Sequence, residues 1–560
     1  MDIKRTVLWV VFSMSLLILW DNWMRHNGKQ SMFFPTSAPI AQQGKDVSAS
    51  TVATAAASAS VAPGATAVPG AAVAAPAIKS ERIIITTDVV KVDIDTLGGE
   101  VKRLELLKHK DDLDKTKNIV LFTESAKRTY LAQTGLLGGD FPNHKTIFVA
   151  KPGPRNLGND NQVQLVLEAE QNGVKLTKTY TFKKNDYVID MKHEVSNSTA
   201  AAIKPSLYLQ LLHDGTKPEN GGMFSATTEF YAPAVYTDEE KFKKLDFETI
   251  EKNHGKADAK PGFITKASNG WVSMIQHFFV SAFIPEDKKE REIFTRKVDT
   301  NLYAVGTIMP MGTVAPGAAI SMNARLYSGP QESAILEKVA PGLDLVKDYW
   351  YFAIIAKPMF WLMEFIHALL GNWGWTIIVF TIVIKLALFP LSAAGYRSMA
   401  KMKVVTPKMT AVREQYKGDP QKMNQAMMEL YKKEKINPLG GCFPILIQMP
   451  IFLSLYWVLQ ASVEMRGAPW MGWITDLTAP DPWFILPVLY AISMYITTKL
   501  NPQPADPMQA KMMLFMPLAF SVMFIFFPSG LVLYWVVNNV LSIGQQWVIN
   551  NKMIPPEHKG

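Results

Sequence analysis

The chain has 560 residues, of which 48% are hydrophobic and only 19% are charged. The charged share is below the roughly 25% of soluble globular proteins, which argues against a disordered, collagen-like or nucleic-acid-coating chain. The net charge of +9 favours an acidic partner such as the inner face of a bacterial membrane, and the single cysteine, Cys442, excludes an internal disulfide and a multi-cysteine zinc site.

The first apolar segment lies near the N-terminus. Thr6 to Trp20 is uncharged and follows Lys4 and Arg5, which is typical of a signal peptide or of a membrane anchor. Cleavage of a signal peptide requires small residues after the apolar run, whereas Trp20 and Trp23 stand here and suit a membrane interface. We therefore expect an uncleaved transmembrane anchor over residues 1–24, with a cleaved signal peptide as the alternative.

A linker and a β-domain follow. Residues 37–77 consist mainly of Ala, Pro, Ser, Gly, Thr and Val without an aromatic residue, which predicts a disordered linker over 25–79. From residue 83 onward, apolar and polar residues alternate in runs that turn signals such as Gly98-Gly99 separate. The runs are Val89–Leu97, Val163–Leu167, Val174–Phe182, Tyr187–Val195, Leu207–Leu212, Trp271–Ile284, Leu302–Ile308 and Ile320–Tyr327. Many strands without intervening helices predict an antiparallel β-sandwich over 80–340, ending in a short helix at Glu332–Val339.

No catalytic motif stands in this β-domain. Its histidines have no metal-ligand spacing, and the chain has no nucleophile elbow and no phosphate-binding GxxxxGK[ST] loop. A single histidine in a strand is usually structural. We therefore interpret the domain as a binding or scaffolding module, and we expect no enzyme activity, no metal and no cofactor.

Aromatic residues and lysines mix in residues 344–370. Trp350, Phe360, Trp361 and Phe365 share this stretch with Lys347 and other charged residues. This composition favours an amphipathic helix in the membrane interface over 341–371. An ordinary connector packed on the sandwich is the alternative.

The C-terminal third holds several uncharged stretches. Residues 512–551 contain no charge, and as one helix they would be about 60 Å long, twice the hydrocarbon thickness of a bilayer. The turn signal Pro528-Ser529-Gly530 divides them into two spans. With the N-terminal anchor this gives six spans in a multi-pass α-helical membrane protein. The C-terminal segments are transmembrane 2 over 372–391, a cytoplasmic helical hairpin over 392–438, transmembrane 3 over 439–463, transmembrane 4 over 482–498, transmembrane 5 over 512–527, transmembrane 6 over 531–549 and a cytoplasmic tail over 550–560.

Basic residues set the predicted orientation. Segment 397–435 carries ten Lys or Arg against four Asp or Glu, while the next loop has Arg466 as its one basic residue. The positive-inside rule places 397–435 in the cytoplasm. Both termini are then cytoplasmic, and residues 25–371 lie on the outer side of the membrane.

Lys385 is the most informative residue of the spans. It lies about 18 Å along the second span, and a lysine inside a span costs about 2.5–3.5 kcal/mol by insertion scales. No Asp or Glu stands in the apolar run of any of the six predicted spans, the first of which is Thr6 to Trp20, so we expect a positive charge in a wet pocket open to the cytoplasm. The alternative is a lysine that snorkels to the inner headgroups.

Other polar residues of the spans suit the same groove. Thr381 lies one helical turn before Lys385, and Gln448 lies inside the third span. In the last span Trp535, Asn538, Ser542 and Gln545 form a polar stripe. Such residues also hydrogen-bond neighbouring helices in many membrane proteins.

The predicted cytoplasmic segment, residues 392–438, is expected to form two helices joined at Gly418-Asp419-Pro420. Met402, Met409, Met423 and Met427 repeat at helical spacing, and methionine suits a surface that recruits varied apolar substrates. The alternative is that these methionines form the hairpin's own core.

Four stretches carry a family resemblance. They are NPLGGCFPILIQMPIFLSLYWVL (437–459), FPSGLVLYWVVNN (527–539), DPMQAKMM (506–513) and MAKMKVVTPKM (399–409). The chain resembles the YidC/Oxa/Alb family of membrane protein insertases in its Gram-negative form, most strongly over 357–550. The resemblance implies an insertase and chaperone with a hydrophilic groove in the inner leaflet, open to cytoplasm and lipid, and a periplasmic β-supersandwich similar to sugar-mutarotase folds.

The same resemblance assigns groove residues and partners. The groove cation of the family is usually Arg, where this chain has Lys385, and the contact positions match Thr381 and Trp535, the latter being Tyr in better-known members. The implied partners are nascent integral membrane proteins, the Sec translocon, the ribosome with the signal recognition machinery, and membrane lipids, with no primary role in nucleic-acid binding. The alternatives are a secondary transporter, although intramembrane carboxylates and an internal repeat are absent from the sequence, and a membrane-tethered carbohydrate enzyme.

Overall fold

The computed structural model describes most of the chain between residues 80 and 549. Within that range it leaves out 112–113, 126–127, 217–230, 257–260, 348, 350–351, 417, 435–442, 502–510, 512–513, 516–518 and 520. The predicted anchor 1–24, the predicted linker 25–79, the tail 550–560 and residues 512–513, 516–518 and 520 of the predicted fifth span lie outside the described residues.

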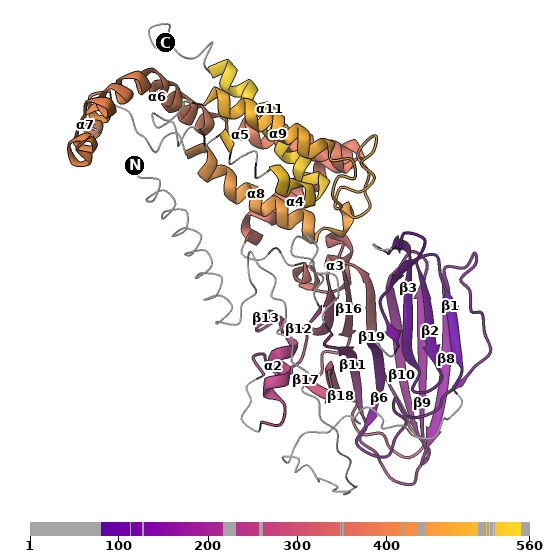
Figure 1. Ribbon diagram of the computed structural model, residues 1–560. Coiled ribbons are helices and arrows are strands. Elements are labelled where there is room, and N and C mark those ends of the chain that lie inside the picture. The colour runs from indigo at the N-terminus through magenta and orange to yellow at the C-terminus, as the bar shows by residue number, and fades with distance from the viewer. Residues whose placement is uncertain are drawn as a thin grey trace, which may run out of the picture. The chain divides into compact units, whose positions relative to one another are not determined.

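The first β-sheet has ten strands in the order β1-β2-β3-β6-β11-β18-β17-β14, with β4 paired to β3 and β5 paired to β6 (Figure 1). Its strands are β1 (Arg82–Thr86), β2 (Val90–Asp95), β3 (Glu100–Lys110), β4 (Asn118–Val120), β5 (Thr123–Glu124), β6 (Thr129–Leu137), β11 (Ser206–Asp214), β14 (Lys266–Ala267), β17 (Arg291–Asp299) and β18 (Leu302–Pro310).

The second sheet has nine strands in the order β13-β12-β15-β16-β19-β10-β9-β8-β7. They are β7 (Val149–Ala150), β8 (Gln162–Gln171), β9 (Val174–Lys183), β10 (Val188–Asn197), β12 (Tyr231–Thr237), β13 (Lys241–Lys244), β15 (Trp271–Gln276), β16 (Phe279–Pro285) and β19 (Ala319–Pro330). All pairs between these strands are antiparallel, and one continuous cluster of buried apolar side chains draws on both sheets. The predicted antiparallel sandwich is confirmed.

The alternation of apolar and polar residues along the strands explains which side chains form the core. One predicted strand boundary is wrong. In β9, Val174, Leu176, Tyr180 and Phe182 are buried at every second position, as the period of two predicts. The run Trp271–Ile284 was expected as one strand, but it forms the hairpin β15–β16. The tight turn at His277-Phe278 carries no Gly, Asn, Asp or Pro, so the usual turn signal is missing.

A lysine occupies a core position of β9. The Lys178 side chain is buried, and its Nζ donates to the carbonyls of Gly98 at 2.6 Å and Thr134 at 2.7 Å. Tyr180 donates to the carbonyl of Gly99 at 2.5 Å. Gly98 and Gly99 both adopt positive φ, and Lys178 and Tyr180 therefore anchor this glycine turn from inside the sandwich.

Three short helical segments border the sandwich or lead out of it. They are α2 (Phe247–Asn253), α3 (Ser333–Val339) and the 3-10 helix η1 (Leu343–Val346). The predicted helix at Glu332–Val339 is confirmed, with Glu332 as its N-cap.

The helical region follows residue 352. Its elements are α4 (Ala353–Leu370), α5 (Trp373–Ala387), α6 (Phe389–Gln415), α7 (Pro420–Lys433), α8 (Phe443–Ala461), η4 (Val463–Met465), α9 (Ile485–Leu500), η5 (Phe524–Phe526) and α11 (Ser529–Val548). Among the described residues, α4 alone is long and apolar enough to cross a membrane as one helix. The pair Trp373–Ala387 and Phe389–Met399 passes the same test together, bent by 68°. The count of six spans stays a prediction.

The boundary between the second span and the hairpin differs from the sequence prediction. Transmembrane 2 was expected over 372–391, but α5 ends at Ala387 and α6 already begins at Phe389. Pro390 is the second residue of α6, where its missing N–H has no intrahelical partner to lose. The proline therefore begins the next helix, and the break lies at Leu388, which caps both helices.

The segment 341–371 is helical over a shorter range than expected, because α4 begins at Ala353. Its inner face, with Ala356, Met359, Phe360 and Met363 among its members, is buried against the helical core. The opposite face is also apolar, with Ile354 88% and Trp361 67% exposed. This helix therefore presents apolar side chains to its surroundings as well as to the core, and its interfacial location stays a prediction.

Candidate functional site

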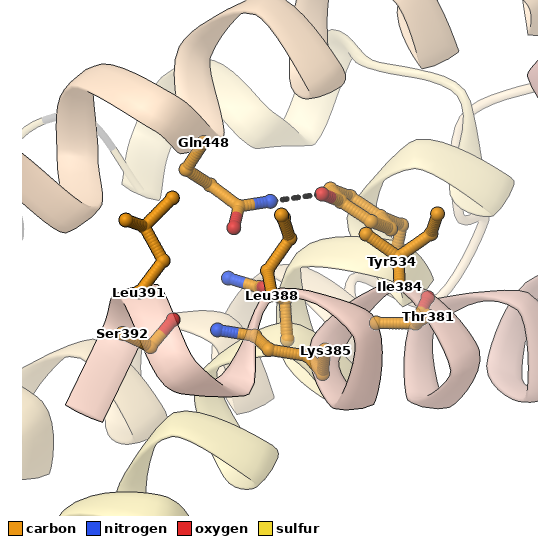
Figure 2. Close-up of a pocket in the computed structure, with 9 residues that line it drawn as sticks. Thr381, Ile384, Lys385, Leu388, Leu391, Ser392, Gln448 and Tyr534 are labelled. Atoms are coloured by element: carbon orange, nitrogen blue, oxygen red, sulfur yellow. Dashed lines mark hydrogen bonds between the residues drawn. The ribbon is translucent and has the colours of Figure 1, made fainter.

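A pocket lies where α5 bends into α6. Its lining residues come from α5, α6, α8 and α11, and they are Thr381, Ile384, Lys385, Leu388, Leu391, Ser392, Gln448, Tyr534 and Asn538 (Figure 2). Thr381 and Lys385 share one face of α5, and the first turn of α6 adds Leu391 and Ser392 because of the 68° bend. The structure thus brings together four of the six predicted groove residues, Lys385, Thr381, Gln448 and Asn538, in one pocket.

The pocket is small in this structure. It offers about 10 Å³ for the centres of water molecules, which is the room that about one water needs. Gln448 on α8 faces Lys385 and Ser392 across this space (Figure 2). Polar side chains of α5, α6 and α8 therefore share this small space.

Lys385 has a hydroxyl partner. Its Nζ donates to Ser542 Oγ at 2.7 Å, and this hydroxyl in turn donates to the carbonyl of Asn538 at 2.7 Å. Gln545 Nε2 donates to the carbonyl of Lys385 at 3.3 Å. Ser542 does not line the pocket, but its hydroxyl binds the ammonium group of Lys385. No ion pair between Lys385 and a carboxylate is recorded in the described part of the chain, so its charge has no carboxylate counterion there.

The structure places Tyr534, rather than Trp535, in the pocket. Tyr534 accepts a hydrogen bond from Gln448 Nε2, which joins α11 to α8 (Figure 2). The ring of Trp535 packs on Phe452 at 4.9 Å and lies near Tyr490 and Phe524. Consecutive helical residues point about 100° apart, so only one of the two can reach the pocket. Tyr534 was not predicted, because the polar stripe of the last span was taken to begin at the next residue, Trp535.

A second polar face of α11 was also missed. Asn539 Nδ2 donates to Ser493 Oγ at 3.1 Å, and Gln546 Nε2 donates to Asn501 Oδ1 at 3.2 Å, both on or next to α9. Asn539 and Gln546 are seven residues apart in the sequence, which places them on the same face of a helix. This spacing could have predicted the second polar face. This face fastens α11 to α9, while the face with Asn538 and Ser542 is turned to α5 and the pocket.

Backbone and side-chain contacts close the bundle at the end away from the α5–α6 bend. Ser529 Oγ donates to the carbonyls of Asp476 at 2.9 Å and Ala479 at 2.8 Å, and the Gly530 N–H donates to Leu477. A Cβ on Gly530 would lie 3.1 Å from the Leu477 carbonyl oxygen, so the loop and α11 approach closely. The loop before α9 therefore covers this end of the helices.

Asp481 holds that loop in place. Its buried carboxylate accepts from Trp473 Nε1 at 2.9 Å, the Trp483 N–H at 3.0 Å and the Leu486 N–H at 2.7 Å. We expect Asp481→Ala to lower the free energy of unfolding by about 2–3 kcal/mol, because three donors lose a charged acceptor in a buried place. Thermal unfolding of the full chain in detergent measures this loss.

The matched control is Asp246→Ala, which removes the exposed carboxylate that caps α2. We expect it to cost about 1 kcal/mol or less. Equal losses in the two variants would contradict a special role of Asp481 in closing the loop.

The predicted recruiting methionines lie in the hairpin α6–α7. Met402, Met409, Met423 and Met427 are all half-buried, whereas Met428 is 58% exposed. The turn at Gly418-Asp419-Pro420 is confirmed, with the Asp419 carboxylate capping α7. This burial is what the hairpin's own seam would produce, and the recruiting role of these methionines stays a prediction.

Comparisons with known proteins cover nearly the whole chain. The family model "60Kd inner membrane protein" matches residues 365–557, and the model "YidC periplasmic domain" matches residues 82–362. A membrane protein insertase YidC from Janthinobacterium sp. (strain Marseille) is 63% identical over 99% of both chains, and one from Herminiimonas arsenicoxydans is 61% identical over 99% of both.

One solved structure, described as an active YidC insertase with its first transmembrane domain resolved, is 19% identical. It covers 83% of this chain and 92% of its own, with a TM-score of 0.38. The two family models together span the described chain, and the identities exceed 60% over full length. The chain belongs to the YidC family of membrane protein insertases.

Proposed function

We propose that this protein inserts newly made integral membrane proteins into the bacterial inner membrane and helps them to fold, alone or together with the Sec translocon. The observation that carries the proposal is Lys385, a cation in a polar pocket among apolar helices, in a chain whose close relatives are named membrane protein insertases. Lys385 is half-buried and has no recorded carboxylate partner among the described residues. A lysine in such a place is costly and is retained where a function needs it.

The proposed topology has six spans with both termini in the cytoplasm and the β-sandwich in the periplasm. The excess of Lys and Arg in residues 397–435 supports this orientation. The pocket then opens near the cytoplasmic ends of the helices, because Lys385 is in the last turn of α5 and α6 leads into the hairpin.

The proposed mechanism makes and breaks no covalent bond. A polar, mildly acidic tail of the substrate is attracted by Lys385, while the adjoining apolar segment moves into lipid along the third and fifth spans. Burial of roughly 20 apolar residues is strongly favourable and needs no nucleotide. The membrane potential adds about 2.3 kcal/mol per negative charge moved outward across 100 mV.

The hairpin α6–α7 is the proposed first contact for the substrate. Its exposed lysines, among them Lys401, Lys422, Lys432 and Lys433, suit an acidic partner such as ribosomal RNA or an anionic lipid surface. Ribosome, signal recognition machinery and Sec translocon are the partners that we propose for this side of the protein. A secondary transporter is not supported by the comparisons, and the β-sandwich is proposed as a scaffold rather than an enzyme.

Site-specific crosslinking tests the proposal. A photoreactive amino acid at Thr381 or Leu388, both in the pocket lining, should crosslink to the polar tail of a stalled nascent membrane protein in inner-membrane vesicles. The same probe at Val488, an exposed apolar residue of α9, is the matched control and should give no adduct with the tail. If the probe at Val488 gives as many adducts as the probes in the pocket, the proposal is wrong.

A further inference from the structure

Lys385 stands at the end of its helix, where a lysine side chain has two places for its charge. It lies two residues before α5 ends at Ala387. From such a helix end, a long and flexible lysine side chain can reach past the helix toward the lipid headgroups. In this structure the Lys385 side chain belongs to the pocket lining instead (Figure 2). The contacts of Lys385 show what holds its charge there.

The ammonium group of Lys385 is bound by a serine hydroxyl of α11. Lys385 Nζ donates to Ser542 Oγ at 2.7 Å, and no other acceptor for this group is recorded among the described residues. The buried Ser542 hydroxyl donates its own hydrogen to the Asn538 carbonyl, four residues earlier in α11, at 2.7 Å. A hydroxyl has one donor and two acceptor sites, so the bond to the helix backbone uses the hydrogen and leaves the oxygen to accept from α5.

The same face of α11 holds Lys385 at a second point. The last carbonyls of a helix have no donor within it, and that of Lys385 accepts from Gln545 Nε2 at 3.3 Å. Ser542 and Gln545 are three residues apart and therefore neighbours on one face of α11. The rotation of α11 is in turn fixed through Asn539 and Gln546, which bond to α9 and to Asn501 next to it. The position of the Ser542 hydroxyl relative to α5 is therefore well defined.

We propose that Ser542 is a positioning residue that keeps the Lys385 ammonium in the pocket, where it attracts the acidic tail of a substrate. This inference rests on the proposed function and adds the residue on which the strength of that attraction depends. An ammonium group has three N–H donors, and the bond to Ser542 uses one of them, so two remain for a carboxylate of the substrate. Without the hydroxyl, the side chain moves toward the headgroups and the attraction falls with distance.

The reactivity of Lys385 in the absence of substrate tests the positioning. A water-soluble acetylating reagent is applied to the protein in lipid nanodiscs, and mass spectrometry measures the rate at Lys385 relative to the exposed Lys499 of α9. We expect Ser542→Ala to raise this relative rate about tenfold, the shift in population that loss of one hydrogen bond to a charged group produces. Ser542→Thr keeps a hydroxyl that can bond the carbonyl four residues earlier, and its rate should stay within twofold of the wild type.

The matched control is Ser454→Ala in α8. The Ser454 hydroxyl is buried and also donates to the carbonyl four residues earlier, that of Pro450, at 2.7 Å, but no bond to Lys385 is recorded for it in the described residues. We expect a change below twofold. An unchanged rate at Lys385 in Ser542→Ala, or an equal rise in Ser454→Ala, would overturn the inference, because the hydroxyl of Ser542 would then have no specific hold on the ammonium.

Insertion into proteoliposomes gives a readout that a merely structural role would not move. One substrate is compared in two versions, with Asp or with Asn residues in its tail. We expect Ser542→Ala to lower the ratio of acidic-tailed to neutral-tailed insertion about fivefold, whereas a general loss of stability would lower both alike. A ratio equal to that of the wild type would contradict the role of Ser542. The acetylation assay contains no substrate, so its result is independent of the crosslinks from Thr381 that test the function itself.

Discussion

Lys385→Glu is expected to abolish insertion of a substrate that has an acidic tail and does not need the Sec translocon. The pocket would then carry a negative charge in a place of low dielectric constant, where like charges repel more strongly than in water. Ser542 would lose its cationic donor and the substrate tail its attraction. We expect at least a tenfold loss of insertion into proteoliposomes, measured as protease-protected substrate.

Two variants separate the charge from other effects. Lys385→Arg keeps the charge and is expected to retain most of the activity, since a guanidinium also donates to a hydroxyl. Lys499→Glu makes the same charge change in the last turn of α9, outside the pocket, and is expected to leave insertion unchanged. If Lys385→Glu inserts the acidic-tailed substrate as well as the wild type does, Lys385 has no electrostatic role.

The sequence was sufficient for the antiparallel sandwich and for a separate helical region because the patterns of the two differ. Alternation with a period of two in β8 to β10 and long uncharged runs after residue 372 need no tertiary information. The break at Leu388 was misplaced because Pro390 fits both the end of one helix and the start of another. The 68° bend between α5 and α6 shows that Pro390 belongs to the start of α6.

The site was predictable in part for a similar reason. Lys385 and Thr381 were found because a charge in an apolar run is visible in any arrangement of helices. Tyr534 stands in an apolar run that gives no sign of a pocket residue. Its place in the pocket depends on the rotation of α11 about its axis. Asn539 and Gln546 fix that rotation through α9, which the sequence of α11 alone does not show.

Lys178 is a buried residue of the sandwich that the sequence pattern does not predict. It stands in the core register of β9, two residues from Leu176 and Tyr180, and pattern reading treats a lysine as exposed. Its two carbonyl partners come from residues 80 and 44 positions away in sequence. Such long-range satisfaction of a buried donor is a tertiary property.

Acidification is expected to destabilise the β-sandwich strongly. Burial lowers the pKa of His109, His144 and His213 from 6.5 to about 4, and that of His193 to about 3. These groups stay neutral in the folded state while the unfolded chain binds protons below pH 6.5. Their contribution to stability is therefore complete above pH 6.5 and is lost as the pH falls toward 4.

The local contacts explain why protonation is resisted. His193 contacts Thr134 Oγ1 at 3.0 Å beside the buried Lys178, so an imidazolium would face another cation. His213 is enclosed by the rings of Tyr130 and Tyr231, each at 4.8 Å between centroids. Neither environment offers water to a new charge.

Two other buried groups titrate near neutrality. Burial raises the pKa of Glu100 to about 7, so its contribution grows as the pH falls below 7 and opposes the histidines. Burial lowers the pKa of Lys178 to about 7, and its contribution changes only between pH 10.5 and 7. Four histidines against one carboxyl leave a net loss on the order of 7 kcal/mol between pH 6.5 and 4.5, at about 1.4 kcal/mol per unit of pKa shift.

Urea unfolding of the full chain in detergent, followed by pulse proteolysis of the sandwich at pH 6.5, 5.5 and 4.5, measures this slope. His193→Gln cannot take up the proton and should reduce the slope by about one proton, whatever its effect on stability at pH 6.5. His254→Gln, at the exposed end of α2, is the matched control for a histidine substitution outside the core. A free energy of unfolding that is constant from pH 6.5 to 4.5, or equal slopes in the wild type and His193→Gln, would show that the buried histidines are not what acid acts on.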